Sequence, residues 1–79
     1  MKIISTDGIV VSSIPFKESS RIINILTKDM GIVGCIVKGC KSLKSKLRLP
    51  SEKFAYGTFH FYYKENGLST LIEADIKLS

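Results

Sequence analysis

Apolar and polar residues alternate over short runs of this chain, which is the period of a β-strand. Turn residues separate five such runs, at 9–14, 21–27, 32–38, 54–63 and 68–76. The first run can begin as early as Ile3. Pro15 should end it, because proline has no amide hydrogen to give to a sheet.

The run 21–27 is apolar at most positions on both faces, so we expect both faces to be covered over at least part of its length. Residues 28–31 predict a tight turn, with Gly31 free to take a positive φ. Runs two and three should therefore pair as an antiparallel hairpin. Gly34 inside the third run predicts a bulge or a bend.

The run 54–63 is rich in aromatic residues, and Gly57 within it should ease a bend. The turn after it, 64–67, contains Asn-Gly, which favours type I′ geometry. Alternation divides the run between an outer and an inner face. The residues expected to point inward are Ala55, Gly57, Phe59, Phe61 and Tyr63.

Five short strands without a long helix predict an all-β protein, a five-stranded Greek-key barrel of the OB-fold type. An SH3-like barrel fits the strand count nearly as well. A basic loop or short helix should join strands three and four. If a helical turn forms there, Leu43 and Leu47 stand four apart and would plug one end of the barrel, with Pro50 closing the segment.

A net charge of +5 on 79 residues favours an anionic partner, either a nucleic acid or an acidic membrane surface. Residues 38–53 hold six of the 12 basic residues and one of the seven acidic ones. Such a stretch suits a polyanion-binding surface, although charge runs are also common on merely solvated loops. No apolar run approaches the length of a membrane span or a signal peptide, so we expect a cytoplasmic location and no membrane partner.

Little in the sequence suggests catalysis, a metal or a cofactor. Cys35 reads as a core residue and Cys40 as a loop residue, and two cysteines make neither a disulfide framework nor a zinc site. His60 should lie on the outer face of a strand. The run 34–42 approaches a phosphate-binding P-loop, but Cys40 stands where the lysine must be. We therefore expect no enzyme and no cofactor.

In barrels of the OB type, oligonucleotides lie across strands two and three and between the first and last loops. Phe16, in the first loop, can either stack on a base or fold back onto the barrel, and Tyr56 and Tyr62 can face outward. Lysine and arginine near these strands should contact phosphates without reading sequence. The predicted DNA-binding residues are Phe16, Lys17, Arg21, Lys38, Lys41, Lys44, Lys46 and Arg48.

Six pieces follow one another along the chain. They are Glu18-Ser19, Thr27 with Gly31, Lys38-Gly39, the basic segment 41–48, the aromatic strand 54–63, and the Leu-x-Thr-Leu-x-x-Ala strand 68–74. No single piece is specific, but together they cover nearly the whole chain. In this order they resemble the N-terminal domain of RecO, the bacterial recombination mediator.

The resemblance implies an OB-fold that binds single- and double-stranded DNA, helps to anneal strands and supports recombinase loading in recombinational repair. It implies RecR and single-strand-binding protein as partners. Residues 1–79 would then be one N-terminal domain, without the family's helical C-terminal domain. The chain departs from the family at Cys40, where a small residue such as alanine is usual, and at the turn 64–67, which carries less positive charge.

The sequence also allows a different kind of function, protein binding. The barrel could be an OB- or SH3-like protein-interaction module that docks an acidic partner peptide, with the lysines meeting its carboxylates or only aiding solubility. The acidic tail of single-strand-binding protein would be such a peptide.

Overall fold

The structure, a computed structural model, describes residues 2–77. It contains strands at the places where the alternation predicts them, and one short helical segment. The elements are β1 (Lys2–Phe16), β2 (Ser20–Thr27), β3 (Gly31–Val37), the 3-10 helix η1 (Leu49–Ser51), β4 (Tyr56–Tyr63) and β5 (Ser69–Ile76).

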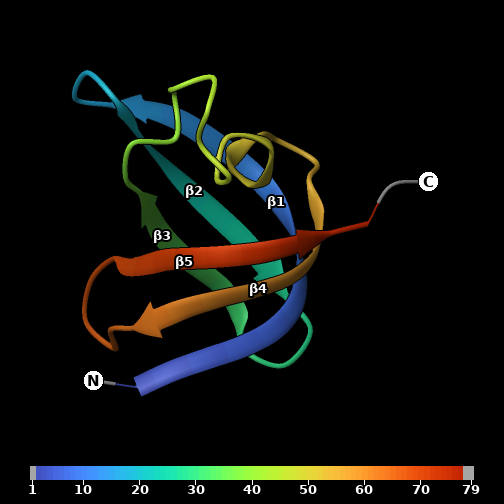
Figure 1. Cartoon of the computed structure of the whole chain (residues 1–79). Helices are drawn as coiled ribbons and strands as arrows, with labels where there is room; N and C mark the ends of the chain where they lie inside the picture. The colour runs from blue at the N-terminus through green and yellow to red at the C-terminus, as the bar shows by residue number, and fades with distance from the viewer. Residues whose placement is uncertain (1, 78–79) are drawn as a thin grey trace.

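The five strands close into a barrel in the order β1-β2-β3-β5-β4, with β4 returning to β1 (Figure 1). All neighbours pair antiparallel except β3 and β5, which run parallel where Cys35 meets Ser69 and Ile36 meets Thr70. This pairing closes the ring and leaves β3 and β4 apart although they follow each other in the chain. The chain is an all-β, five-stranded OB-fold barrel, as the sequence predicts.

The core lies inside the barrel and is made by every second residue of the strands. Ile23 and Ile25 of β2 are fully buried, and so are Phe59 and Phe61 of β4, which confirms the predicted inner face of the aromatic strand. The outer face of β2 is half-buried at Ile22 and Asn24 and exposed at Leu26 (47%), so it is covered over part of its length, as expected. The buried hydrophobic residues are Val10, Ile23, Ile25, Val33, Cys35, Val37, Cys40, Phe59, Phe61 and Leu71.

Strand β1 is longer than the apolar run suggests, and Pro15 does not end it. The first half of β1 pairs with β4 and the second half with β2, and the pairing with β2 continues through Pro15 opposite Arg21. On the side away from β2, Val10 bonds to the link before β4, and beyond Val10 no strand pairs there. A residue there can lack an amide hydrogen without breaking a ladder on the open side, which is where sheets tolerate proline.

The bulge predicted at Gly34 is absent, because Gly34 pairs in register with Asn24. Register shifts occur instead between Val10 and Ser12 of β1 and between His60 and Phe61 of β4. A side chain at Gly34 would approach a methyl group of Leu68 and the side-chain oxygen of Asn24. Glycine at this position therefore avoids crowding on the outer face.

The connection between β3 and β4 plugs the barrel end in a different way from the one predicted. Leu43 is 78% exposed, so it plugs nothing, whereas Leu47 packs against the core. Cys40 is fully buried and belongs to the core although it lies in a turn. Pro50, in η1, is also buried. The segment is mostly turns, and its helical part is a single 3-10 turn.

The β2–β3 turn agrees with the sequence prediction, whereas the β4–β5 turn does not. Gly31 takes φ 68° in the β2–β3 turn, as expected. Asn66 is not among the described residues with positive φ, so the β4–β5 turn is not type I′. Instead the amide of Lys64 donates to Ser69 Oγ at 3.0 Å across a longer connection.

We expect Gly57→Ala to destabilise the barrel by about 2–3 kcal/mol, the upper range for overpacking. An added methyl group would collide with the carbonyl oxygen of Asp75 on the neighbouring strand, and backbone cannot move as a side chain can. Gly39→Ala is the matched control, since open space surrounds Gly39 and only its φ of 67° is unfavourable. Urea unfolding that gave equal losses for both variants would contradict this steric argument.

We expect the stability of the fold to fall above pH 9 through Cys35. Burial raises the pKa of its thiol from 9.0 to about 12, so between these values the unfolded chain loses a proton that the folded chain keeps. The unfolding free energy then drops by up to about 1.4 kcal/mol per pH unit from this group. Cys35→Ala should flatten the dependence between pH 9 and 11. Parallel stability curves for the two proteins would refute this.

Candidate nucleic-acid interface

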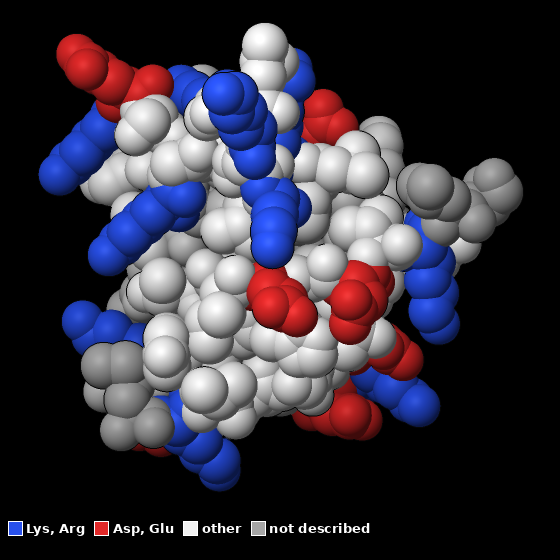
Figure 2. All heavy atoms as spheres, in the orientation of Figure 1, with Lys and Arg blue, Asp and Glu red and all other residues white. Residues whose placement is uncertain are grey.

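The topology places the predicted phosphate-contacting residues at one end of the barrel. Because β1, β2 and β3 are antiparallel neighbours, β1 ends, β2 begins and β3 ends at the same side: Phe16 pairs with Ser20, and Arg21 with Val37. The connection to β4 leaves from there. Figure 2 shows Lys and Arg side chains over this upper end, together with some Asp and Glu, and further Lys and Arg side chains standing apart at the right and at the bottom.

Backbone hydrogen bonds join the β1–β2 turn to the basic connection. The amide of Lys41 donates to the carbonyl oxygen of Ser19 at 3.2 Å, and the amide of Gly39 donates to Ser20 Oγ at 3.4 Å. Lys17 and Lys41 therefore belong to adjoining surface segments although they lie far apart in the chain. We call this end of the barrel, formed by residues 17–21 and 38–53, the basic end; it also carries two carboxylates, those of Glu18 and Glu52.

Arg21 is fixed by its neighbours. Its Nε donates to Ser13 Oγ at 2.6 Å, and one terminal nitrogen donates to the carbonyl oxygen of Ser13 at 3.2 Å. The Ser13 hydroxyl in turn donates to the carbonyl oxygen of Ser51 at 2.6 Å. The guanidinium group has five N–H donors, so it keeps further donors for an anion while its position is set.

A pocket of about 350 Å³ opens beside Arg21, and we call it the basic pocket. Four cationic side chains line it against one carboxylate, which is the charge balance that a phosphate group requires. Arginine adds the planar fork that matches phosphate oxygens. Its lining residues are Ser13, Arg21, Cys40, Lys41, Arg48, Ser51, Glu52 and Lys53.

Phe16 does not stand free in the solvent. Its side chain is half-buried, and the ammonium group of Lys17 lies 5.4 Å from the centre of its ring. This cation–π contact occupies part of the ring surface. The expectation that Phe16 stacks on a base therefore stays a prediction, and the fold-back alternative has gained a physical basis.

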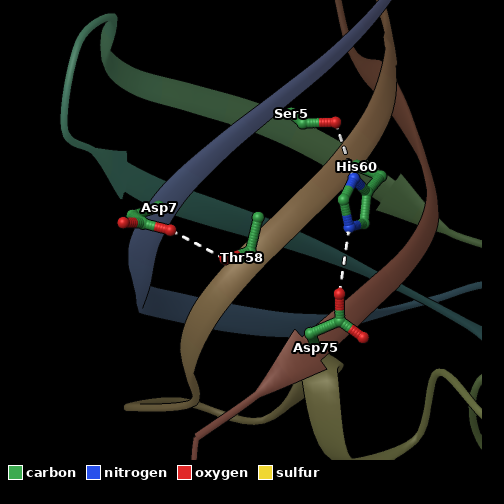
Figure 3. Close-up of polar contacts among 5 residues, drawn as sticks. All are labelled: Ser5, Asp7, Thr58, His60 and Asp75. Atoms are coloured by element: carbon green, nitrogen blue, oxygen red, sulfur yellow. Dashed lines mark hydrogen bonds and ion pairs between the residues drawn. The ribbon is translucent and has the colours of Figure 1, made fainter.

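Ser5, His60 and Asp75 form a chain of contacts across β1, β4 and β5 (Figure 3). Ser5 Oγ lies 2.6 Å from His60 Nδ1, and His60 Nε2 lies 3.3 Å from Asp75 Oδ2. These residue types make hydrolase triads, but there the acid is buried. Here the Asp75 side chain is 78% exposed on the outer face of the barrel. The chain of contacts is a cross-strand polar ladder, like the neighbouring bond from Thr58 to Asp7.

Residues 2–77 contain neither a cluster of metal-ligating side chains nor a membrane-spanning helix. No three His, Cys, Asp or Glu side chains gather closely enough there to hold a metal ion together. No helix within that range has the length and apolar character to cross a membrane.

Comparison with known proteins identifies the family. The family model described as "Recombination protein O N terminal" matches residues 1–79, the whole chain. The chain belongs to the RecO family.

Several similar RecO proteins are named "DNA repair protein RecO". The one from Listeria monocytogenes is 33% identical over 70 residues, which cover 89% of this chain and 27% of that protein. The one from Thermodesulfovibrio yellowstonii is 33% identical over 72 residues, or 91% of this chain and 29% of that protein. The one from Bacillus pumilus is 32% identical over 74 residues, or 94% and 28%. The chain thus spans less than a third of these relatives.

Within this RecO-family domain, three of the predicted site residues line the basic pocket: Arg21, Lys41 and Arg48. Lys38 and Lys44 are exposed on the same end, outside the pocket. Lys46 lines a neighbouring hollow of about 290 Å³ that it shares with Arg48. Three further lining residues were not predicted as site residues: Ser13 of β1, and Ser51 and Lys53 of the connection.

We expect Ser13→Ala to lower the unfolding free energy of this RecO-family domain by about 1–2 kcal/mol, because Arg21 and the Ser51 carbonyl both lose a partner. Amide exchange in residues 48–54 should speed up. Ser12→Ala is the control, since Ser12 Oγ only accepts a bond from Asn24, at 2.8 Å, away from the connection. Equal exchange in both variants would mean that Ser13 does not hold the connection.

Proposed function

We propose that this domain binds DNA through its phosphates, without sequence specificity, in DNA repair and recombination. The observation that carries the proposal is the basic pocket, in which Arg21 is held in place by Ser13 and faces Lys41, Arg48 and Lys53. Phosphate contacts position a nucleic acid without reading its bases. Similar proteins of the RecO family carry the name "DNA repair protein RecO", which agrees with such a role.

The physical basis is counterion release. Each phosphate that a lysine or arginine neutralises frees condensed cations from the DNA, so affinity falls as salt rises. A rigid surface improves this gain, because its side chains need little ordering on binding. The basic end has that rigidity where hydrogen bonds join the β1–β2 turn to the connection.

The same proposal covers both single- and double-stranded DNA, since both carry the phosphate backbone. In the bacterial cytoplasm the domain would support strand annealing and recombinase loading, with RecR and single-strand-binding protein as its partners. These finer roles rest on the family resemblance. They concern whole RecO proteins, of which this chain matches the N-terminal part.

Salt dependence tests the phosphate contacts. If about five cations engage a single strand, log K should fall with log salt at a slope near −3.5. Replacing Lys41, Lys44 and Lys46 with alanine should reduce the magnitude of that slope by about 2 and weaken binding, without unfolding the domain. Fluorescence anisotropy with a labelled oligonucleotide at several salt concentrations measures both effects.

The control replaces Lys2, Lys28 and Lys64 with alanine, which removes the same charge from strand ends and turns elsewhere on the barrel. It should leave the slope nearly unchanged. If both triple variants lose affinity equally, only net charge matters and the basic end is not the interface. A titration with an acidic peptide tests the protein-interaction alternative, which would be favoured if the peptide bound and the oligonucleotide did not.

A further inference from the structure

Phe54 has an unusual position beside the basic pocket. The sequence places it in the fourth strand, but β4 begins at Tyr56, and Phe54 lies in the link between η1 and that strand. Its side chain is 66% exposed. Its φ is 75°, a conformation that a bulky side chain rarely adopts. Strained residues of this kind occur mostly at binding and catalytic sites.

Backbone hydrogen bonds impose this conformation. The amide of Phe54 donates to the carbonyl oxygen of Val10 at 2.8 Å, and the amide of Val10 donates to the carbonyl oxygen of Ala55 at 2.9 Å. The amide of Ala55 donates to the carbonyl oxygen of Glu52 at 3.1 Å. The link is thus attached to β1 on one side and to the end of η1 on the other. The ring is held outward by rigid backbone.

The surface around the ring continues into the basic pocket. The ammonium group of Lys53 lies 5.0 Å from the centre of the Phe54 ring, and Lys53 also lines the basic pocket. A second hollow of about 310 Å³ lies on the side of the ring, and it shares Glu52 and Lys53 with that pocket. Its lining residues are Leu49, Glu52, Lys53, Phe54, Ala55, Tyr56, Ile76 and Lys77.

We propose that Phe54 is a stacking platform for an unpaired base of a DNA strand whose phosphate lies in the basic pocket, with Lys53 between the two. This site rests on the proposed DNA binding and adds a preference to it. A nucleotide joins a flat apolar base to an anion, and this surface joins an exposed ring to four cations. Bases stack on aromatic side chains whatever their identity, so the site needs no sequence readout.

Strand selectivity follows from the same geometry. In a duplex both faces of each internal base are already stacked, so only a single strand can offer a base to Phe54. Phosphate contacts serve both forms equally. The domain should therefore bind single strands more tightly than duplex, and the difference should depend on Phe54.

The observations favour Phe54 over Phe16 for this role. Phe16 is half-buried, whereas Phe54 is 66% exposed. A lysine ammonium lies near each ring, at 5.4 Å and 5.0 Å, so exposure alone separates the two. An exposed ring can instead contact a protein partner. The four cations of the adjoining pocket suit a phosphate backbone better than an apolar protein surface.

The test compares Phe54→Ala with wild type, using a labelled thymidine oligonucleotide and a duplex with closed hairpin ends. We expect Phe54→Ala to weaken single-strand binding about 5-fold or more and to leave duplex binding within twofold. Tyr62→Ala removes an outward-facing aromatic side chain of β4, 39% exposed, and should change neither affinity. Phe54→Gly should lose single-strand affinity without a lower melting temperature, because glycine accepts the positive φ.

A fluorescence measurement reports stacking directly. The chain contains no tryptophan, so Phe54→Trp introduces a single reporter. Its emission should be quenched by the single strand, whereas the emission of Tyr62→Trp should not. Equal losses on single strand and duplex for Phe54→Ala, or no loss on either, would overturn the stacking site while leaving the phosphate contacts standing. If wild type bound neither DNA, the proposed function itself would fail, and this site with it.

Discussion

The order of strands in the barrel determines the path of the chain at its basic end. β3 and β4 are consecutive in the chain, but β5 lies between them in the ring. The connection must therefore cross the barrel mouth instead of forming a hairpin. Its inward residues, Cys40 and Pro50 among them, close the core from that side. Its lysines face the solvent, and its last residues turn back along β1, where Phe54 bonds to Val10.

Much of the fold could be predicted from local pattern, because a strand buried on one face shows its period in the sequence. The inner face of β4 and the turn at Gly31 follow from that pattern. The course of β1 does not, since the shift between Val10 and Ser12 interrupts the alternation, and two different strands pair with its halves. Leucine spacing also misleads in the connection. Leu43 and Leu47 would share a helix face, but the segment forms turns, so only Leu47 reaches the core.

The candidate site could likewise be predicted from the sequence only in part. Clustered charge along the chain pointed to the basic end, and antiparallel pairing brings the β1–β2 turn to the same place. The pocket itself was not predictable, because it depends on Ser13 from β1 meeting Ser51 across 38 positions of sequence. Phe54 was missed because alternation assigns it to a strand. Its positive φ arises from bonds to residues that are distant in the chain.

Pro15 has a consequence for how this barrel behaves in a crowded cell. Beyond Val10, which bonds to the link before β4, the second half of β1 pairs with β2 and with no strand on its other side, where Ile14 is exposed. Bare edges recruit strands from other molecules and begin aggregation. A proline at this point gives an incoming strand no amide to bond, and the positive charges nearby repel a second copy. This end of the barrel can thus stay uncovered without inviting self-association there.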